Sequence, residues 1–227
     1  MPTCARSIRV SLLLPTLLLS QTATTSRLSG VVNDDSGKPL AGAFVTAIGQ
    51  STGHATYNTT TDPNGSYSFS NITPDKYAIC VQSPAGARLN NCQWSTPTQL
   101  TAAANQASTQ NLTLPQGAIL EVLVNDPQKL IARDDDLLIA VHLPSGAFYP
   151  MPVATSNAAM RTYECAVPLR TSLRISVVSR HLQLADDKAN SLAPLNGAPS
   201  ATSSTLTFPG QSALHGPPVT LTITGRK

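Results

Sequence analysis

Charged and aromatic residues are scarce in this 227-residue sequence. Asp, Glu, Lys and Arg together make up 12% of it and Phe, Trp and Tyr 4%, whereas 41% of the residues are hydrophobic. This balance argues against both an intrinsically disordered chain and a membrane protein. The basic residues form no cluster on any expected strand, so the electrostatic footprint of a nucleic-acid-binding protein is missing and we expect no nucleic-acid partner.

A long hydrophobic run is missing as well. The apolar stretch from Val10 to Leu19 is too short to cross a bilayer. It follows Arg6 and Arg9 and precedes small polar residues, an arrangement typical of a secretory signal peptide, with a retained anchor as the alternative. We therefore expect residues 1–23 to be cleaved. The mature protein would be secreted or periplasmic, with no stable membrane span and nearly balanced charges.

Thr, Ser and Val, which favour β-strands, are abundant, and clusters of Gly, Pro, Asn and Asp divide them into short alternating runs. Asp62-Pro63-Asn64-Gly65 predicts a tight turn joining two antiparallel strands, because Pro fixes φ and Gly accepts a positive φ. Alternation predicts strands in the first half at 27–33, 43–48, 55–61, 66–69, 76–82 and 108–114. In the second half it predicts strands at 118–125, 137–142, 147–149, 162–167, 173–179, 205–208 and 219–224.

The same alternation assigns inner faces to several side chains of the first half, namely Tyr67 with Phe69, Tyr77 with Ile79 and Val81, and Leu112 with Leu114. No run has convincing helical periodicity. Two segments, 83–106 and 186–218 around its one strand, are rich in Ala, Ser, Asn and Pro and are expected to be long loops.

The turn motifs between Ser29 and Val81 resemble those of a known family. The chain reads Asp35-x-Gly-x-Pro-Leu-x-Gly-Ala-x-Val, then Thr61-Asp-x-Asn-Gly-x-Tyr-x-Phe-x-Asn-Ile, then Pro74-x-x-Tyr. Over residues 28–114 the sequence is similar to the carboxypeptidase regulatory-like domain. That resemblance implies a transthyretin-like sandwich of about seven strands, and it ends near Pro115.

The expected fold is all-β, with two tandem β-sandwich domains of the Ig-like or transthyretin-like kind after the N-terminal signal peptide. Pro115-Gln116-Gly117 breaks the strand pattern, which resumes at Ala118. We expect a signal peptide at 1–23, a carboxypeptidase regulatory-like sandwich at 27–115 and a second sandwich of unassigned family at 118–225.

The resemblance prompts a search for the zinc site of carboxypeptidases, in which a His is followed by Glu three residues later. The four histidines, His54, His142, His181 and His215, have no carboxylate at that position, so the resemblance is to the accessory domain alone. The sequence also contains no Gly-x-Ser-x-Gly elbow and no phosphate-binding glycine loop. We therefore expect no enzymatic activity, no catalytic or metal-binding residues and no cofactor.

Two alternatives to the expected absence of catalytic and metal-binding residues remain open. The acidic runs 134–136 and 186–187 offer oxygen ligands for calcium, but without the alternating spacing that surrounds one ion, so a solvated face is favoured. A catalytic or metal role would return if two of His142, His181 and Asp186 lay within metal-ligand distance.

Three cysteines, Cys80, Cys92 and Cys165, follow the expected signal peptide and would meet an oxidising compartment. Cys80 lies in an expected strand and Cys92 follows the polar loop, which makes these two the favoured disulfide pair. Closing that loop stabilises by about 3 kcal/mol. Cys165 is then either a buried free thiol or a partner in a different pairing.

Trp94, the only tryptophan, follows Cys92 by two residues. Its ring is a possible stacking platform for a sugar, because an indole face matches the C–H side of a pyranose. The favoured alternative is that the indole caps one end of the sandwich core.

The leading functional hypothesis is accordingly a secreted, non-catalytic binding, adhesion or scaffold module at the cell envelope, with an envelope protein or a glycan as partner. The alternatives are a carbohydrate-binding module that uses Trp94 and, with less support, an uncharacterised hydrolase accessory domain.

Overall fold

The computed structural model describes residues 25–51, 53–84, 88–133, 136–192, 202–208 (backbone only), 210 and 213–227. In these ranges the protein is all-β, as expected, and contains one turn of helix, α1 (Asn91–Trp94). The expected signal peptide lies outside the described residues, as do Asp134 and Asp135 of the first acidic run. None of the described ranges holds a helix with the length and apolar character needed to cross a bilayer.

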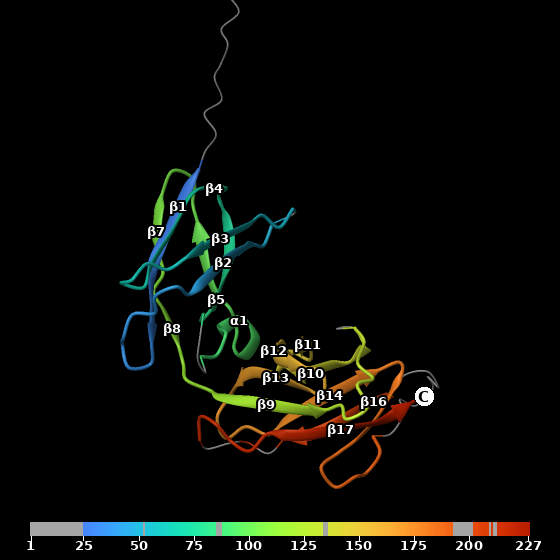
Figure 1. Ribbon diagram of the computed structural model, residues 1–227. Coiled ribbons are helices and arrows are strands. Elements are labelled where there is room, and N and C mark those ends of the chain that lie inside the picture. The colour runs from blue at the N-terminus through green and yellow to red at the C-terminus, as the bar shows by residue number, and fades with distance from the viewer. Residues whose placement is uncertain are drawn as a thin grey trace, which may run out of the picture.

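The strands before residue 115 form what we call the N-terminal unit (Figure 1). They are β1 (Ser26–Asp34), β2 (Phe44–Gly49), β3 (Thr56–Thr60), β4 (Ser66–Ile72), β5 (Asp75–Gln82), β6 (Thr98–Ala102), β7 (Ala107–Thr109) and β8 (Leu112–Leu114). One sheet has the order β4-β1-β7, with β8 also pairing with β1, and the other has the order β3-β2-β5-β6. The side chains assigned to inner faces by alternation are buried in one shared core.

The strands after residue 117 form the C-terminal unit (Figure 1). They are β9 (Ala118–Asn125), β10 (Leu138–His142), β11 (Phe148–Pro150), β12 (Val153–Asn157), β13 (Met160–Val167), β14 (Leu173–Ser179), β15 (Leu182–Ala185), β16 (Thr202–Phe208) and β17 (Val219–Arg226). The sheets have the orders β12-β13-β9-β17-β15 and β11-β10-β14-β16. A second apolar core, separate from the first, fills the space between them.

The two units share one strand order. In the N-terminal unit the first strand, β1, pairs antiparallel with β4 and parallel with the last strand, β8. In the C-terminal unit β9 pairs in the same way with β13 and β17. The opposite sheets correspond strand by strand, so that β2 matches β10, β5 matches β14 and β6 matches β16. The C-terminal unit therefore repeats the topology of the N-terminal unit, with β12 and β15 added at the edges of one sheet.

A buried aspartate ends the first strand of each unit. Asp34 accepts hydrogen bonds from the amides of Ser36 and Lys38, both at 2.9 Å. Asp126, directly after β9, accepts from the amides of Leu130 at 2.9 Å and Ile131 at 2.8 Å. Both carboxylates thus satisfy backbone donors of the connection that crosses to the second sheet.

The expected tight turn is present but links two sheets. The Asp62 side chain accepts from the amides of Asn64 and Ser66, each at 2.8 Å, and Gly65 has φ of 73°. Immediately after the turn, the Gly65 carbonyl accepts from Val32 of β1 at 2.8 Å. The chain therefore passes from β3 to β4 of the opposite sheet, instead of forming a hairpin within one sheet.

The expected loop 83–106 is wrong, because it contains α1 and β6. One helical turn is too short to produce a periodic pattern, and the five residues of β6 include only two apolar side chains. The strands β12 and β15 were not expected either. All five residues of β12 are exposed, so this edge strand has no buried face to reveal it, and β15 is only four residues long.

The expected strand 108–114 is divided into β7 and β8. Between them the Asn111 side chain accepts a hydrogen bond from the Val31 amide at 3.0 Å, in place of a backbone partner. Gly30 permits this close approach, since a Cβ there would lie within 1.8 Å of the Gln110 carbonyl oxygen.

Candidate functional site at the junction of the two units

Residues 80–84 and 88–94 lie at the junction between the units, with α1 on the side that faces β12 and β13 (Figure 1). The disulfide expected between Cys80 and Cys92 is present, with their Cα atoms 5.3 Å apart. Asn91 donates from its amide to the Ile79 carbonyl at 2.8 Å and accepts from the Val81 amide at 2.8 Å. Because β6 pairs with β5 only up to Ile79, this side chain continues the edge contacts of β5 and fixes α1 against it.

Arg88 ties this segment to the end of β1. Its guanidinium donates to Asp34 at 3.0 Å and also to Asp35. Asp35 in turn accepts from the Gln116 amide at 3.1 Å. Hydrogen bonds from Ser36 and then from the Lys38 amide hold the pKa of Asp34 below its usual value, and the Gln116 amide followed by Arg88 does the same for the pKa of Asp35.

The connection between the units is closely packed. The Leu89 amide donates to the Pro115 carbonyl at 3.0 Å, and the Leu89 side chain is buried. A Cβ on Gly117 would lie 2.5 Å from the Val167 carbonyl oxygen and 2.6 Å from Leu89. Residues 115–117 thus pass through a space that only glycine fits at its narrowest point.

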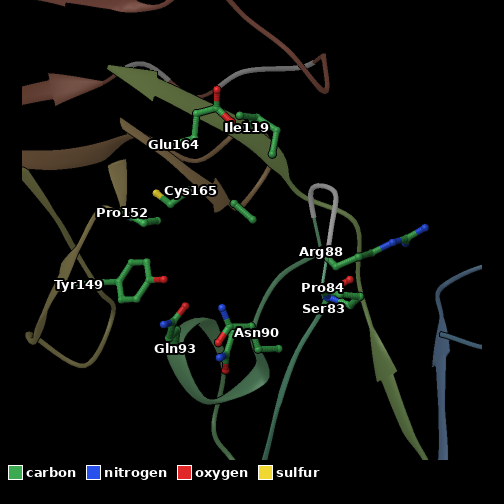
Figure 2. Close-up of a pocket in the computed structure, with 12 residues that line it drawn as sticks. Ser83, Pro84, Arg88, Asn90, Gln93, Ile119, Tyr149, Pro152, Glu164 and Cys165 are labelled. Carbon is green, nitrogen blue, oxygen red and sulfur yellow. The ribbon is translucent and has the colours of Figure 1, made fainter. Parts of the chain in front are cut away.

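A polar cavity of about 280 Å³ lies in the junction (Figure 2). Figure 2 shows the Tyr149 hydroxyl directed into the space, with the Gln93 side chain reaching up beside it from α1. The cavity is lined from the N-terminal unit by Gln82, Ser83, Pro84, Arg88, Asn90 and Gln93, and from the C-terminal unit by Ile119, Tyr149, Pro152, Glu164, Cys165 and Ala166.

Cys165 is a buried free thiol, which is one of the two alternatives left open by the sequence. Burial raises the pKa of this thiol to about 12. At neutral pH it therefore stays protonated, and a protonated thiol is a poor nucleophile and a poor metal ligand.

Trp94 lies half-buried and packs against the core of the C-terminal unit. The sequence suggested that the Trp94 indole caps the core of its own sandwich. In the structure the indole packs instead against the core of the C-terminal unit. The remaining part of Trp94 lines a second hollow, here called the Trp94 groove, also of about 280 Å³. The other lining residues come from the C-terminal unit: His142, Leu143, Pro144, Pro168, Thr171, Ser172, Leu173 and Arg174.

His142 is held in the wall of the Trp94 groove. Its Nε2 lies 2.8 Å from the Ser176 hydroxyl, and its ring packs edge-to-face on Phe148 with centroids 4.5 Å apart. Burial and then the nearby charge of Arg174 lower the pKa of His142. The imidazole is therefore neutral at physiological pH, and Arg174 supplies the positive charge of the groove.

Two acidic candidates for metal binding, Asp186 and Asp136, accept hydrogen bonds from backbone amides. The Asp186 carboxylate accepts from the amides of Lys188 at 2.9 Å and Asn190 at 2.8 Å, as expected of a turn residue. Asp136 similarly accepts from the Ala132 amide. Within the residues that the structure describes, no group of three or more His, Cys, Asp and Glu side chains is placed to hold a metal ion.

A known family model matches the N-terminal unit. Residues 27–115 match the family model of the carboxypeptidase regulatory-like domain, which confirms the resemblance of the first half. No curated protein sequence matches the chain.

Among solved structures, the chain is similar to the Streptococcal ancillary pilin, with a TM-score of 0.40, 11% identity and coverage of 90% of this chain and 63% of the pilin. The Bacillus anthracis TIE protein gives a TM-score of 0.36, 10% identity and coverage of 88% of this chain and 34% of that one. A putative adhesin from Bacteroides ovatus gives a TM-score of 0.31, 8% identity and coverage of 93% and 94%. The chain thus spans about a third to two thirds of the length of the first two.

Proposed function

We propose that the protein is an extracytoplasmic, non-catalytic binding or scaffold module of the cell envelope, built from two β-sandwich domains at 27–115 and 118–225. The observation that carries this proposal is the junction. A disulfide-closed segment of the N-terminal unit packs Trp94 on the core of the C-terminal unit, and the narrow passage at Gly117 adds a second constraint. An arrangement of this kind holds the two units in a set orientation, as a scaffold requires.

Two further observations support the location and the absence of catalysis. A disulfide persists in oxidising compartments such as the periplasm or the cell exterior. In the described part of the chain, burial keeps the Cys165 thiol protonated, and the Asp126 and Asp186 carboxylates accept hydrogen bonds from backbone amides.

Cell fractionation tests the location. The full chain should appear outside the cytoplasm with Cys80 and Cys92 joined, whereas a variant that lacks residues 1–23 should stay in the cytoplasm with both thiols reduced. Full-length protein found in the cytoplasm with free Cys80 and Cys92 would contradict the proposal.

Co-sedimentation with washed cell envelopes tests the binding role. The purified protein should be retained in a saturable way, and unlabelled protein should compete with labelled protein. Sedimentation that does not saturate, or none at all, would rule out a specific envelope partner.

A second candidate function is carbohydrate binding, and one specific observation favours it. Trp94 keeps part of its surface in a groove beside a cation and two hydroxyl-bearing residues, which are the kinds of group that surround a stacked sugar. Binding on a glycan array that is lost in Trp94→Ala and retained in Phe44→Ala, a matched exposed aromatic on β2, would support it.

A further inference from the structure

We propose that the Trp94 groove binds an acidic saccharide, with one sugar ring stacked on Trp94 and its carboxylate paired with Arg174. This inference rests on the second candidate function and assigns a ligand class to it. The site is composite, because Trp94 comes from the N-terminal unit and Arg174 from β14 of the C-terminal unit.

The aromatic platform is held in place before any ligand arrives. One part of Trp94 packs against the C-terminal core, and α1 is fixed to β5 by the disulfide and by the two hydrogen bonds of Asn91. A preorganised ring loses little conformational freedom on binding, so more of the stacking free energy is available for affinity.

The charge of the groove selects the ligand. Arg174 is exposed, and none of the residues that line the groove is Asp or Glu. Among the residues that the structure describes, no ion pair joins Arg174 to a carboxylate. A guanidinium presents two parallel donors that match a carboxylate, and a uronic acid carries that group on a pyranose ring.

The polar cavity of Figure 2 provides the contrast. It has the same volume, but its arginine, Arg88, is already paired with Asp34 and Asp35, and Glu164 lies in its wall. An anion bound in that cavity would therefore find no unpaired guanidinium with which to form an ion pair. The volume of the Trp94 groove lies just below the range of about 300–1,000 Å³ found for ligand pockets, which suits a single ring with the Thr171 and Ser172 hydroxyls beside it.

Isothermal titration with trigalacturonate and with its fully methyl-esterified form tests the proposal, because the two probes differ in charge and share their ring geometry. We expect the acid to bind at least tenfold more tightly than the ester, as a charge-assisted contact implies. Arg174→Ala should remove this preference. Trp94→Ala should weaken both ligands, and Trp94→Phe should restore part of the affinity.

Arg180→Ala and Phe44→Ala are the matched controls, since both side chains are exposed and neither lines the groove. Both should bind within about twofold of the unmodified protein, a difference well under the tenfold step of 1.4 kcal/mol. Thermal unfolding of every variant separates loss of binding from loss of fold, and Arg174→Ala, an exposed position, should unfold like the parent.

The outcomes distinguish this inference from the functions on which it rests. Equal affinity for acid and ester, or an undiminished preference in Arg174→Ala, overturns the acidic ligand and leaves Trp94-dependent sugar binding in place. Absence of binding to either saccharide, together with saturable envelope retention, overturns the groove as a sugar site and leaves the binding-module proposal standing.

Discussion

The two units reach the same strand order with different local chemistry. The N-terminal unit uses compact turns, such as Asp62 to Gly65, and a disulfide across the β5 edge. The C-terminal unit has no disulfide among its described residues, replaces the compact β3–β4 turn with a connection that contains β12, and adds β15 at the opposite edge. The positions of the apolar strands and of a buried aspartate after the first strand are common to both. The shared topology thus does not depend on the turn motifs.

The largest effect should come from truncating matched core positions. Ile79 of β5 and Ile175 of β14 occupy corresponding strands and are fully buried. Ile79→Ala and Ile175→Ala should each cost about 2–5 kcal/mol, because both leave cavities. Differential scanning calorimetry should show a separate transition lowered in each variant. If both variants lower one shared transition equally, the two cores unfold together and the comparison of independent units fails.

Removing the disulfide should affect the N-terminal unit. Cys80→Ser combined with Cys92→Ser opens a loop with a sequence separation of 12, which predicts a loss of about 3 kcal/mol. Because α1 would then be held mainly by Asn91, Trp94 fluorescence should also shift to longer wavelength as the indole gains solvent exposure.

Reduction of the unmodified protein serves as the control for that variant, since it should reproduce both changes. An unchanged Trp94 spectrum after loss of the disulfide would show that contacts with the C-terminal core alone position the helix.

Acid should destabilise the N-terminal unit through Asp34. Its pKa is lower in the folded protein than the ordinary value of 3.8, so the folded state binds fewer protons than the unfolded state when pH lies between the two values. The stabilisation is complete above the ordinary value and is lost as pH falls through the folded pKa. Unfolding titrations at several pH values should show a weaker acid dependence in Asp34→Asn. Identical pH profiles for variant and parent would contradict this assignment.

The smallest effect concerns the C-terminal unit, in which Cys165 should be unreactive toward thiol reagents. Since burial raises the pKa of Cys165 to about 12, the folded protein should not react with a thiol reagent at pH 8. In protein that lacks residues 1–23, and with them Cys4, one thiol should react after unfolding in denaturant without reductant. Rapid labelling of the native protein would mean that β13 opens readily.

The sequence predicted the features that arise from local chemistry. The inner faces of β4 and β5 follow from alternation, and the Cys80–Cys92 pair follows from two cysteines that flank one loop. The strand β12 was not predicted, because an exposed edge strand needs no apolar face. The short helix α1 was not predicted, because its stability comes from the Asn90 cap and from contacts with β5.

The candidate site was predictable only in part, because most of it depends on contacts between distant segments. The sequence singled out Trp94, but nothing near it in the chain indicates that Arg174 and His142 lie alongside. Arg88 and Asp34 are 54 residues apart, and no local pattern pairs them. Pro115 to Gly117 was interpreted as a break between strands, whereas the structure shows that Gly117 is required by close packing.

The parallel pairing of first and last strands gives each unit a mechanical polarity. Since β1 and β8 run in the same direction, as do β9 and β17, the chain enters a unit at one pole and leaves at the opposite pole. Tension applied between the two ends of a unit would load these ladder hydrogen bonds together, in shear, instead of opening them one at a time. Each unit is thus built as a link in series, oriented to resist being pulled along the direction of the chain.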